Sequence, residues 1–261
     1  MAERIGGLRG GFEGEIRKLR QEAGLMSQRY ALVFPGQSGS FKGMGDGLYE
    51  HRAVKALDRR FADIAGFSPL EKSISPTDKE LKRNDISQVV RLFWQFIYGR
   101  QFEFSRRQRG LPKPQYIAGH SFGQFSALVE AGSIEWQSAV FLVRERGLAM
   151  QNAIEENPGE LIALSVGTGV AGRPSKRDKK LLREFVKEGE GNDLMFPEAF
   201  NSSSQIVVGC RLEDVDRVQR EVSGVGRIKA TVLGAPGAFH TKLMDPARED
   251  FDKALALTPI E

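Results

Sequence analysis

The chain has 261 residues, the length of one large domain or of one domain with a smaller companion. Hydrophobic residues make up 40% of it, and 29 glycines bring the apolar share near one half, which excludes a disordered chain. The formal net charge of +4 is too small to mark a nucleic-acid binder by charge alone, although it can attract anionic substrates.

The cysteine, histidine and hydropathy patterns bear on cellular location, metal binding and membrane insertion. The single cysteine, Cys210, cannot close an intramolecular disulfide, so a reducing, cytoplasmic location is expected. The three histidines, His51, His120 and His240, lie too far apart in sequence to form a spaced metal motif. No apolar run approaches the roughly 20 residues that a membrane-spanning helix needs. Residues 1–28 alternate arginine with glutamate, unlike a signal peptide, and we expect them to form an N-terminal arm.

The first part of the chain predicts a strand followed by helices. The run YALVFPG, residues 30–36, is a short apolar segment that ends in proline and glycine, as a buried strand does before a tight loop. A glycine-rich loop and a helix up to Ala65 follow it. Residues 86–104 carry apolar side chains at helical spacing and predict a buried helix whose aromatic residues belong to the core.

The most informative stretch is QYIAGHSFGQFSALVEAGSI, residues 115–134, which predicts a strand, a sharp turn and a helix. Gly119, Ser121 and Gly123 supply the G-x-S-x-G pattern of a nucleophile elbow. Glycines flank the serine in such a turn because the backbones come so close that a Cβ would clash. The serine itself is forced into a strained conformation that exposes its hydroxyl.

The second part of the chain predicts an inserted subdomain. After a helix at residues 139–154, the patterns from residue 161 to 233 read as strand, helix, strand, strand, helix, strand, the βαββαβ order of a ferredoxin-like unit. We therefore expect an α/β protein with a hydrolase-like parallel-sheet core and an inserted ferredoxin-like subdomain. Residues 29–159 and 234–261 would form the large domain, residues 160–233 the small one, and the active site would lie in the cleft between them.

A serine hydroxyl near neutral pH needs a neighbouring base, which is normally a histidine. His240 is the best candidate because it follows the glycine-rich segment GAPGAFH in a predicted loop. His120 adjoins Ser121 and is expected to point elsewhere on the turn, and His51 is expected in a polar helix. Ser121 and His240 are thus the predicted catalytic pair.

Four motifs occur in a fixed order, namely FPGQ at 34–37, GHSFGQFSAL at 119–128, RERG at 144–147 and GAFHTKLM at 237–244. With the predicted insert between the third and fourth motifs, residues 30–261 resemble the malonyl-CoA:acyl carrier protein transacylases and the acyltransferase domains of fatty-acid and polyketide synthases. The loop GQSGS and Gln124 depart from the family's usual spelling, and neither change removes a catalytic atom. The family continues beyond the equivalent of Glu261, so we expect the C-terminal part of the large domain to be missing.

The resemblance implies an acyltransferase that moves malonyl from malonyl-CoA to the phosphopantetheine thiol of acyl carrier protein through an ester on Ser121, with His240 as base. It also implies that the backbone N–H groups of Phe122 and Gln37 stabilise the oxyanion. Arg146 would bind the malonyl carboxylate through two parallel hydrogen bonds. No cofactor is implied, because malonyl-CoA is a substrate.

Basic residues suggest where an acidic carrier protein docks. One candidate cluster comprises Arg100, Arg106, Arg107, Arg109 and Lys113, and a second comprises Lys176, Arg177, Lys179 and Lys180. A solvated helix end is the alternative interpretation of the first cluster. Arg144, two residues before the expected carboxylate ligand, is predicted to be an ordinary surface residue.

Two other functions remain open at this point. An α/β-hydrolase-type esterase would use the same elbow, with Asp214 or Asp216 as the triad acid ahead of the histidine. A noncatalytic carrier-binding module would bind the carrier without forming an acyl-serine.

Overall fold

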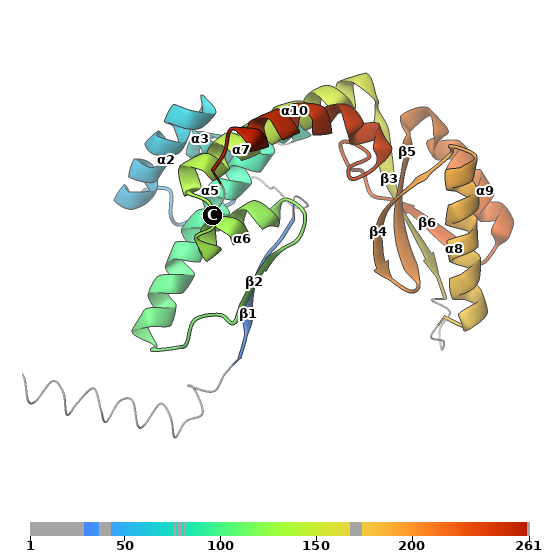
Figure 1. Cartoon of the computed structure of the whole chain (residues 1–261), viewed down its shortest axis with the longest axis horizontal. Helices are drawn as coiled ribbons and strands as arrows, with labels where there is room; N and C mark the ends of the chain where they lie inside the picture. The colour runs from blue at the N-terminus through green and yellow to red at the C-terminus, as the bar shows by residue number, and fades with distance from the viewer. Residues whose placement is uncertain are drawn as a thin grey trace, which may run out of the picture. The chain divides into compact units, whose positions relative to one another are not determined.

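The computed structural model describes residues 29–36, 43–75, 77, 80, 82–167 and 174–259 (Figure 1). The predicted N-terminal arm, residues 1–28, and Gln37 lie outside these ranges. The chain divides into two compact units: unit 1 comprises Met1–Pro76, Gln88–Phe141 and Pro259–Glu261, and unit 2 comprises Thr77–Ser87 and Leu142–Thr258.

Unit 1 contains a two-stranded parallel sheet and several helices. In chain order its elements are β1 (Ala31–Phe34), α2 (Arg52–Ala65), α3 (Pro69–Ile74), most of α5 (Asn84–Gln108), β2 (Tyr116–Gly119), α6 (Gly123–Ala131) and the start of α7 (Trp136–Glu156). The two strands pair in register from Ala31 opposite Tyr116 to Phe34 opposite Gly119. Since Gly119 is the last residue of β2, this register brings the end of β1 beside the predicted elbow.

Helix α5 forms the core of unit 1. Phe61 of α2 and Phe93 of α5 are fully buried, with ring centroids 5.2 Å apart, and Phe61 also stacks on Trp136. The indole N–H of the buried Trp94 donates a hydrogen bond of 2.7 Å to the Ser73 hydroxyl, so its polar atom is satisfied. The buried helix predicted for this stretch, with aromatic side chains in the core, is confirmed.

Unit 2 contains a four-stranded antiparallel sheet. Its elements include β3 (Gly159–Val166), α8 (Lys176–Gly191), β4 (Phe196–Ser202), β5 (Gln205–Arg211), η2 (Leu212–Asp214), α9 (Val215–Val225), β6 (Ile228–Val232), η3 (Lys242–Met244) and α10 (Asp245–Ala256). The predicted βαββαβ order is confirmed, and the sheet order β4-β5-β3-β6 is that of a ferredoxin-like unit. Helix α10 was not among the predicted elements.

The two faces of this sheet contact different parts of unit 2. Ile162 and Leu164 of β3 pack with residues of α8 and α9 on one face. Their neighbours Leu161 and Ala163 point to the other face, because side chains alternate along a strand, and pack with the segment before and within η3. The loop that carries His240 therefore belongs to the same compact unit as the small subdomain. Unit 2 is larger than the predicted subdomain, because it also includes Thr77–Ser87 and most of α7.

Throughout the ranges that the structure describes, the helices are too short or too polar to cross a lipid bilayer.

Candidate functional site

Ser121 lies on the turn between β2 and α6, with a φ of 48°, in the left-handed region that residues other than glycine rarely adopt. Lack of room for a Cβ explains why both flanking residues are glycines. A Cβ added to Gly119 would lie 2.2 Å from the backbone of Gly123, and one added to Gly123 would lie 2.3 Å from the carbonyl oxygen of Phe34. The strained serine and the crowded glycines predicted for a nucleophile elbow are both confirmed.

Phe122 immediately follows the serine and is the N-cap residue of α6, with a fully buried side chain. Its backbone N–H belongs to the first turn of a helix, where N–H groups have no intrahelical acceptor and the helix dipole favours negative charge. This is the position that an oxyanion donor beside Ser121 requires. The other donor implied by the resemblance, Gln37, is not among the described residues.

His120 and His51, the histidines that were not predicted to be the base, both contact nearby backbone groups. The backbone N–H of His120 donates to the Phe34 carbonyl at 3.0 Å, and its ring lies against Gly36, where an added Cβ would be 2.7 Å from Nδ1. His51 was predicted to lie within a helix, but it is the N-cap residue just before α2. Its Nδ1 accepts the N–H of Ala53 at 3.3 Å, which satisfies one of the free donors at the helix start.

His240 occupies an exposed turn of unit 2, with a φ of 56°. The backbone is fixed on both sides of it. Ala238 is fully buried, and a Cβ added to Gly159 or Gly209 would lie 2.8 or 2.9 Å from the Ala238 Cβ. Thr241 caps η3, and its hydroxyl donates to the Ala238 carbonyl at 2.6 Å. A general base must be reachable by its substrate, and the exposed position of His240 on a fixed turn meets that requirement.

Arg146 lies on α7 and is half-buried. Burial lowers its pKa to about 10, so the guanidinium remains charged at neutral pH. Met150, one turn later on the same face of the helix, packs with Met244 of η3. Within unit 2, α7 thus carries Arg146 on the side that packs against the segment after His240.

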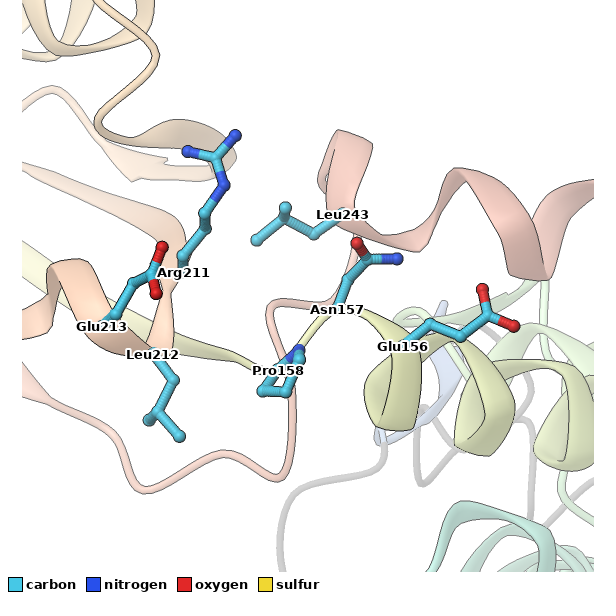
Figure 2. A pocket seen from close by; sticks show the side chains of 7 residues that line it. All are labelled: Glu156, Asn157, Pro158, Arg211, Leu212, Glu213 and Leu243. Atoms are coloured by element: carbon cyan, nitrogen blue, oxygen red, sulfur yellow. The ribbon is translucent and has the colours of Figure 1, made fainter.

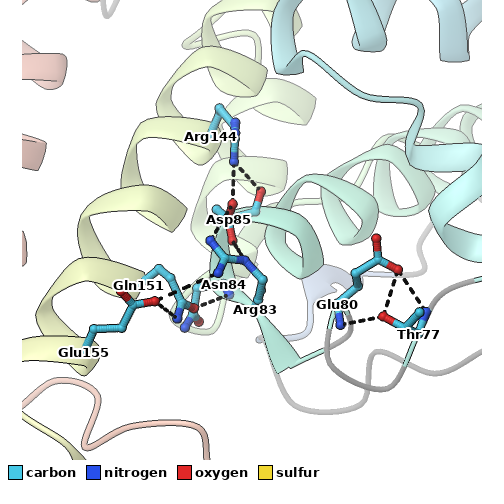
Figure 3. Close-up of polar contacts among 8 residues, drawn as sticks. All are labelled: Thr77, Glu80, Arg83, Asn84, Asp85, Arg144, Gln151 and Glu155. Atoms are coloured by element: carbon cyan, nitrogen blue, oxygen red, sulfur yellow. Dashed lines mark hydrogen bonds and ion pairs between the residues drawn. The ribbon is translucent and has the colours of Figure 1, made fainter.

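Arg144 is not the ordinary surface residue that was predicted (Figure 3). Its Nη1 donates to the carboxylate of Asp85 at 2.9 Å and to the Asp85 carbonyl at 3.1 Å, and Arg83 pairs with the same carboxylate at 3.0 Å. A Cβ added to Gly147 would lie 2.7 Å from the Asp85 Cα. The start of α5 is therefore fixed against the turn of α7 that carries Arg146. No local pattern signals this contact, because 59 residues separate its partners.

Both interpretations of the first basic cluster, carrier docking and a solvated helix end, place Arg106 on the surface, and this is wrong. It is buried, and its guanidinium makes two hydrogen bonds of 2.6 Å to Glu103 and one of 2.6 Å to the Leu111 carbonyl. The exposed Arg107 also donates to Glu103 at 2.6 Å. Hydrogen bonds from Arg106, and then from Arg107, lower the pKa of Glu103 to about 2. Two members of the predicted cluster thus stabilise the end of α5.

Asp214 and Asp216, the candidate triad acids of the esterase alternative, lie in positions that favour structural roles. Asp214, in η2, forms an ion pair of 3.7 Å with Arg211. Asp216 is exposed in the first turn of α9, where the helix dipole favours a negative charge. A triad acid is instead buried and hydrogen-bonded to its histidine.

A pocket of about 530 Å³ lies at the junction of α7 and β3 (Figure 2). Its lining consists of Glu156, Asn157, Pro158, Arg211, Leu212, Glu213 and Leu243, and so includes none of the predicted site residues. Arg211, the basic residue of this lining, is held by Asp193 at 2.6 Å. With its cation already paired, the pocket is not an evident anion site.

Comparison with known proteins finds a matching family model, similar sequences and similar solved structures. A family model described as "Acyl transferase domain" matches residues 31–260. The malonyl CoA-acyl carrier protein transacylase of Bacillus subtilis (strain 168) is 31% identical over 230 residues, which cover 87% of this chain and 68% of that protein. The solved malonyl-CoA:acyl carrier protein transacylase of Xanthomonas oryzae pv. oryzae is 28% identical, with a TM-score of 0.75 over 90% of this chain and 71% of that one. A malonyl-transacylase solved in complex with a type II polyketide synthase acyl-carrier protein is 26% identical, with a TM-score of 0.72 over 90% of this chain and 72% of that one.

Proposed function

Because the chain belongs to the acyl transferase domain family, we propose that it transfers malonyl from malonyl-CoA to the phosphopantetheine thiol of an acyl carrier protein. Relatives of the same fold carry this activity in their names, and one is solved with its carrier protein. The observation that supports the proposal most is the elbow, where the strained Ser121 is followed by the N-terminal N–H groups of α6. Acyl transfer needs both a presented hydroxyl and donors for an oxyanion.

In the first half-reaction, the Ser121 hydroxyl attacks the thioester carbonyl of malonyl-CoA while His240 takes its proton. The Phe122 N–H, together with that of Gln37, stabilises the oxyanion of the tetrahedral intermediate. When the intermediate collapses, His240 gives the proton to the departing sulfur. Coenzyme A leaves as a thiol, and malonyl remains as an ester on the serine.

In the second half-reaction, the phosphopantetheine thiol of the carrier attacks this ester, and His240 takes the thiol proton. Collapse of the second intermediate returns the proton to Ser121 and releases malonyl-carrier. The route is ping-pong, and nucleophile, base and oxyanion donors all come from the chain. It therefore calls for neither a metal nor a redox cofactor.

Arg146 is the proposed ligand of the malonyl carboxylate. A guanidinium presents two parallel donors that fit a carboxylate, and partial burial strengthens such a pair because water screens it less. Its charge at neutral pH follows from a pKa of about 10. This residue would distinguish malonyl from uncharged acyl groups.

The product feeds fatty-acid or polyketide synthesis, both of which extend acyl chains on carrier proteins with malonyl units. We also propose a cytoplasmic location, which agrees with a coenzyme A substrate and with a single cysteine.

A two-step labelling experiment tests this function. The protein is mixed with malonyl-CoA that is radiolabelled in the malonyl group, separated from free nucleotide, and then given a phosphopantetheinylated carrier protein. We expect label on the protein in the first step and on the carrier in the second. Rapid release of free malonate without carrier would indicate the esterase, and carrier binding without any label on the protein would indicate the noncatalytic module.

A further inference from the structure

Helix α5 buries polar side chains among its apolar ones, and Arg91 and Gln95 are two of them. Arg91 and Gln95 lie one helical turn apart among buried residues such as Leu92 and Phe93, and their exposed fractions are only 4% and 8%. Burial of a guanidinium is costly, and desolvation lowers the pKa of Arg91 to about 10. Polar groups at such positions have specific partners.

The partners are the carbonyl groups at the end of β1. Arg91 Nη1 donates to the Gly36 carbonyl at 3.2 Å, and Gln95 Nε2 donates to the Pro35 carbonyl at 2.9 Å. The Gln95 side-chain oxygen also accepts a hydrogen bond from the hydroxyl of Ser126 on α6. The amide of Gln95 thus bridges the end of β1 and the helix that begins at the elbow.

The elbow packs directly on the segment that these side chains hold. A Cβ added to Gly123 would lie 2.3 Å from the Phe34 oxygen and 2.7 Å from the Pro35 oxygen, so the two backbones are in close contact. The Phe34 carbonyl also accepts the N–H of His120, the residue just before Ser121. A shift of the Pro35 carbonyl would therefore be transmitted to the turn that carries the serine.

We propose that Gln95 and Arg91 are positioning residues that hold the end of β1 and the start of α6 in the geometry that acylation of Ser121 requires. This rests on the proposed function, because it needs the serine to be acylated. The two side chains act through the backbone of the elbow and do not contact the reacting atoms. Since a misplacement of about 1 Å can cost roughly a hundredfold in rate, loss of the bridge should slow the chemical step itself.

The test compares single-turnover acylation by malonyl-CoA in five proteins: wild type, Gln95→Met, Ser126→Ala, the double variant of these two, and Ser73→Ala. Gln95→Met removes both bonds of the bridge, and Ser126→Ala removes the bond to α6 alone. Ser73→Ala is the matched control, because it removes an equally buried hydrogen bond made by Trp94 of the same helix without touching β1. Melting temperatures and the KM for malonyl-CoA are measured in parallel.

We expect Gln95→Met to lower the acylation rate constant by about tenfold or more with an unchanged KM, and Ser126→Ala to lower it by a smaller factor. Because the two residues share one bond, the double variant should be no slower than Gln95→Met alone. Ser73→Ala should lose melting temperature but keep the wild-type rate.

Acylation by Gln95→Met at the wild-type rate, or slowed no more than in Ser73→Ala, would overturn the positioning role. If Gln95→Met does not fold, the acylation rate constants of Ser126→Ala and Ser73→Ala are compared instead. Equal rate constants in these two variants would overturn the positioning role. If wild type is not acylated at all, the proposed function fails and this inference fails with it, whereas a fast wild type with an equally fast Gln95→Met refutes the inference alone.

Discussion

Ser121 and His240 share an uncommon backbone conformation, with φ values of 48° and 56°. A residue other than glycine in this region costs about 1–3 kcal/mol and persists only where its surroundings hold it there. Asp193 is the third such residue in the described part of the chain. The surroundings of Ser121 are the crowded elbow, and those of His240 are the buried Ala238 and the cap of η3. Such strain clusters at functional sites, so it supports a functional role for each of the two residues.

At the scale of the single residue, Arg146→Ala should change which acyl group is transferred. The loss of a charge-assisted bidentate pair should lower the preference for malonyl over acetyl by about ten- to a hundredfold, the equivalent of roughly 1.5–3 kcal/mol. Arg146→Lys should restore only part of it, because an ammonium lacks the paired donors. The measurement is kcat/KM for malonyl-CoA and acetyl-CoA in each variant.

Arg144→Ala provides the control on the same helix. This residue pairs with the buried Asp85, so its removal should lower the melting temperature, because the carboxylate would keep only its pair with Arg83, and it should leave the acyl preference as it is. If Arg146→Ala keeps the wild-type preference, or if Arg144→Ala changes it equally, the carboxylate-binding role of Arg146 is refuted.

At the scale of the element, the elbow depends on the close packing of α6 against β1. Gly123→Ala should destabilise the protein by about 1–3 kcal/mol or more, since its Cβ would meet two backbone oxygens that have no room to move. It should also abolish acylation. Gly224→Ala in α9 is the matched control: no atom lies within 4 Å of its added Cβ, so alanine should add up to about 1 kcal/mol of helix stability. Urea unfolding of both variants makes the comparison, and an unaffected Gly123→Ala would contradict it.

The C-terminal end of α5 has a pH-dependent stability. The pKa of Glu103 is lowered to about 2 by hydrogen bonds from Arg106 and Arg107, so the unfolded chain takes up its proton at a higher pH than the folded protein does. This stabilisation is complete above a pH of about 4.5 and disappears as the pH falls through about 2. Glu103→Gln should therefore melt a few degrees below wild type at about pH 6, with a smaller gap at about pH 3. A difference in melting temperature that does not change with pH would show that the ion pairs of Glu103 contribute nothing to stability.

Local patterns predicted most elements, and long-range contacts explain what they missed. The elbow and the βαββαβ order depend on glycine spacing and on side-chain periodicity, which are properties of short segments. Arg106 was assigned to the surface because a basic run at a helix end is usually solvated, but the carbonyl of Leu111 folds back onto it. The Arg144 contact with Asp85 and the Gln95 bridge join segments far apart in sequence, so no window of sequence contains them.

At the scale of the whole molecule, the proposed reaction assigns roles to residues that are far apart in the sequence. Ser121 and Phe122 belong to unit 1, and Arg146 and His240 belong to unit 2. Elimination among three histidines was enough to pair His240 with Ser121 from the sequence. The role of Arg146 came only from the resemblance, because no pattern in its helix specifies a distant partner. Ser121 should lose most of its reactivity when the proposed base is removed, because a serine hydroxyl is a poor nucleophile at neutral pH. His240→Ala should slow acylation of Ser121 by about a thousandfold or more, with the elbow intact.

The most direct test is the intact mass of the protein after it is mixed with malonyl-CoA. The account predicts a gain of about 86 Da, the mass of a malonyl group that replaces one hydrogen, because nucleophilic catalysis proceeds through a covalent ester. Peptide mapping should place the adduct on Ser121, and Ser121→Ala should show no gain. An adduct of the same mass that persists in Ser121→Ala, or that maps to another residue, would contradict the central claim.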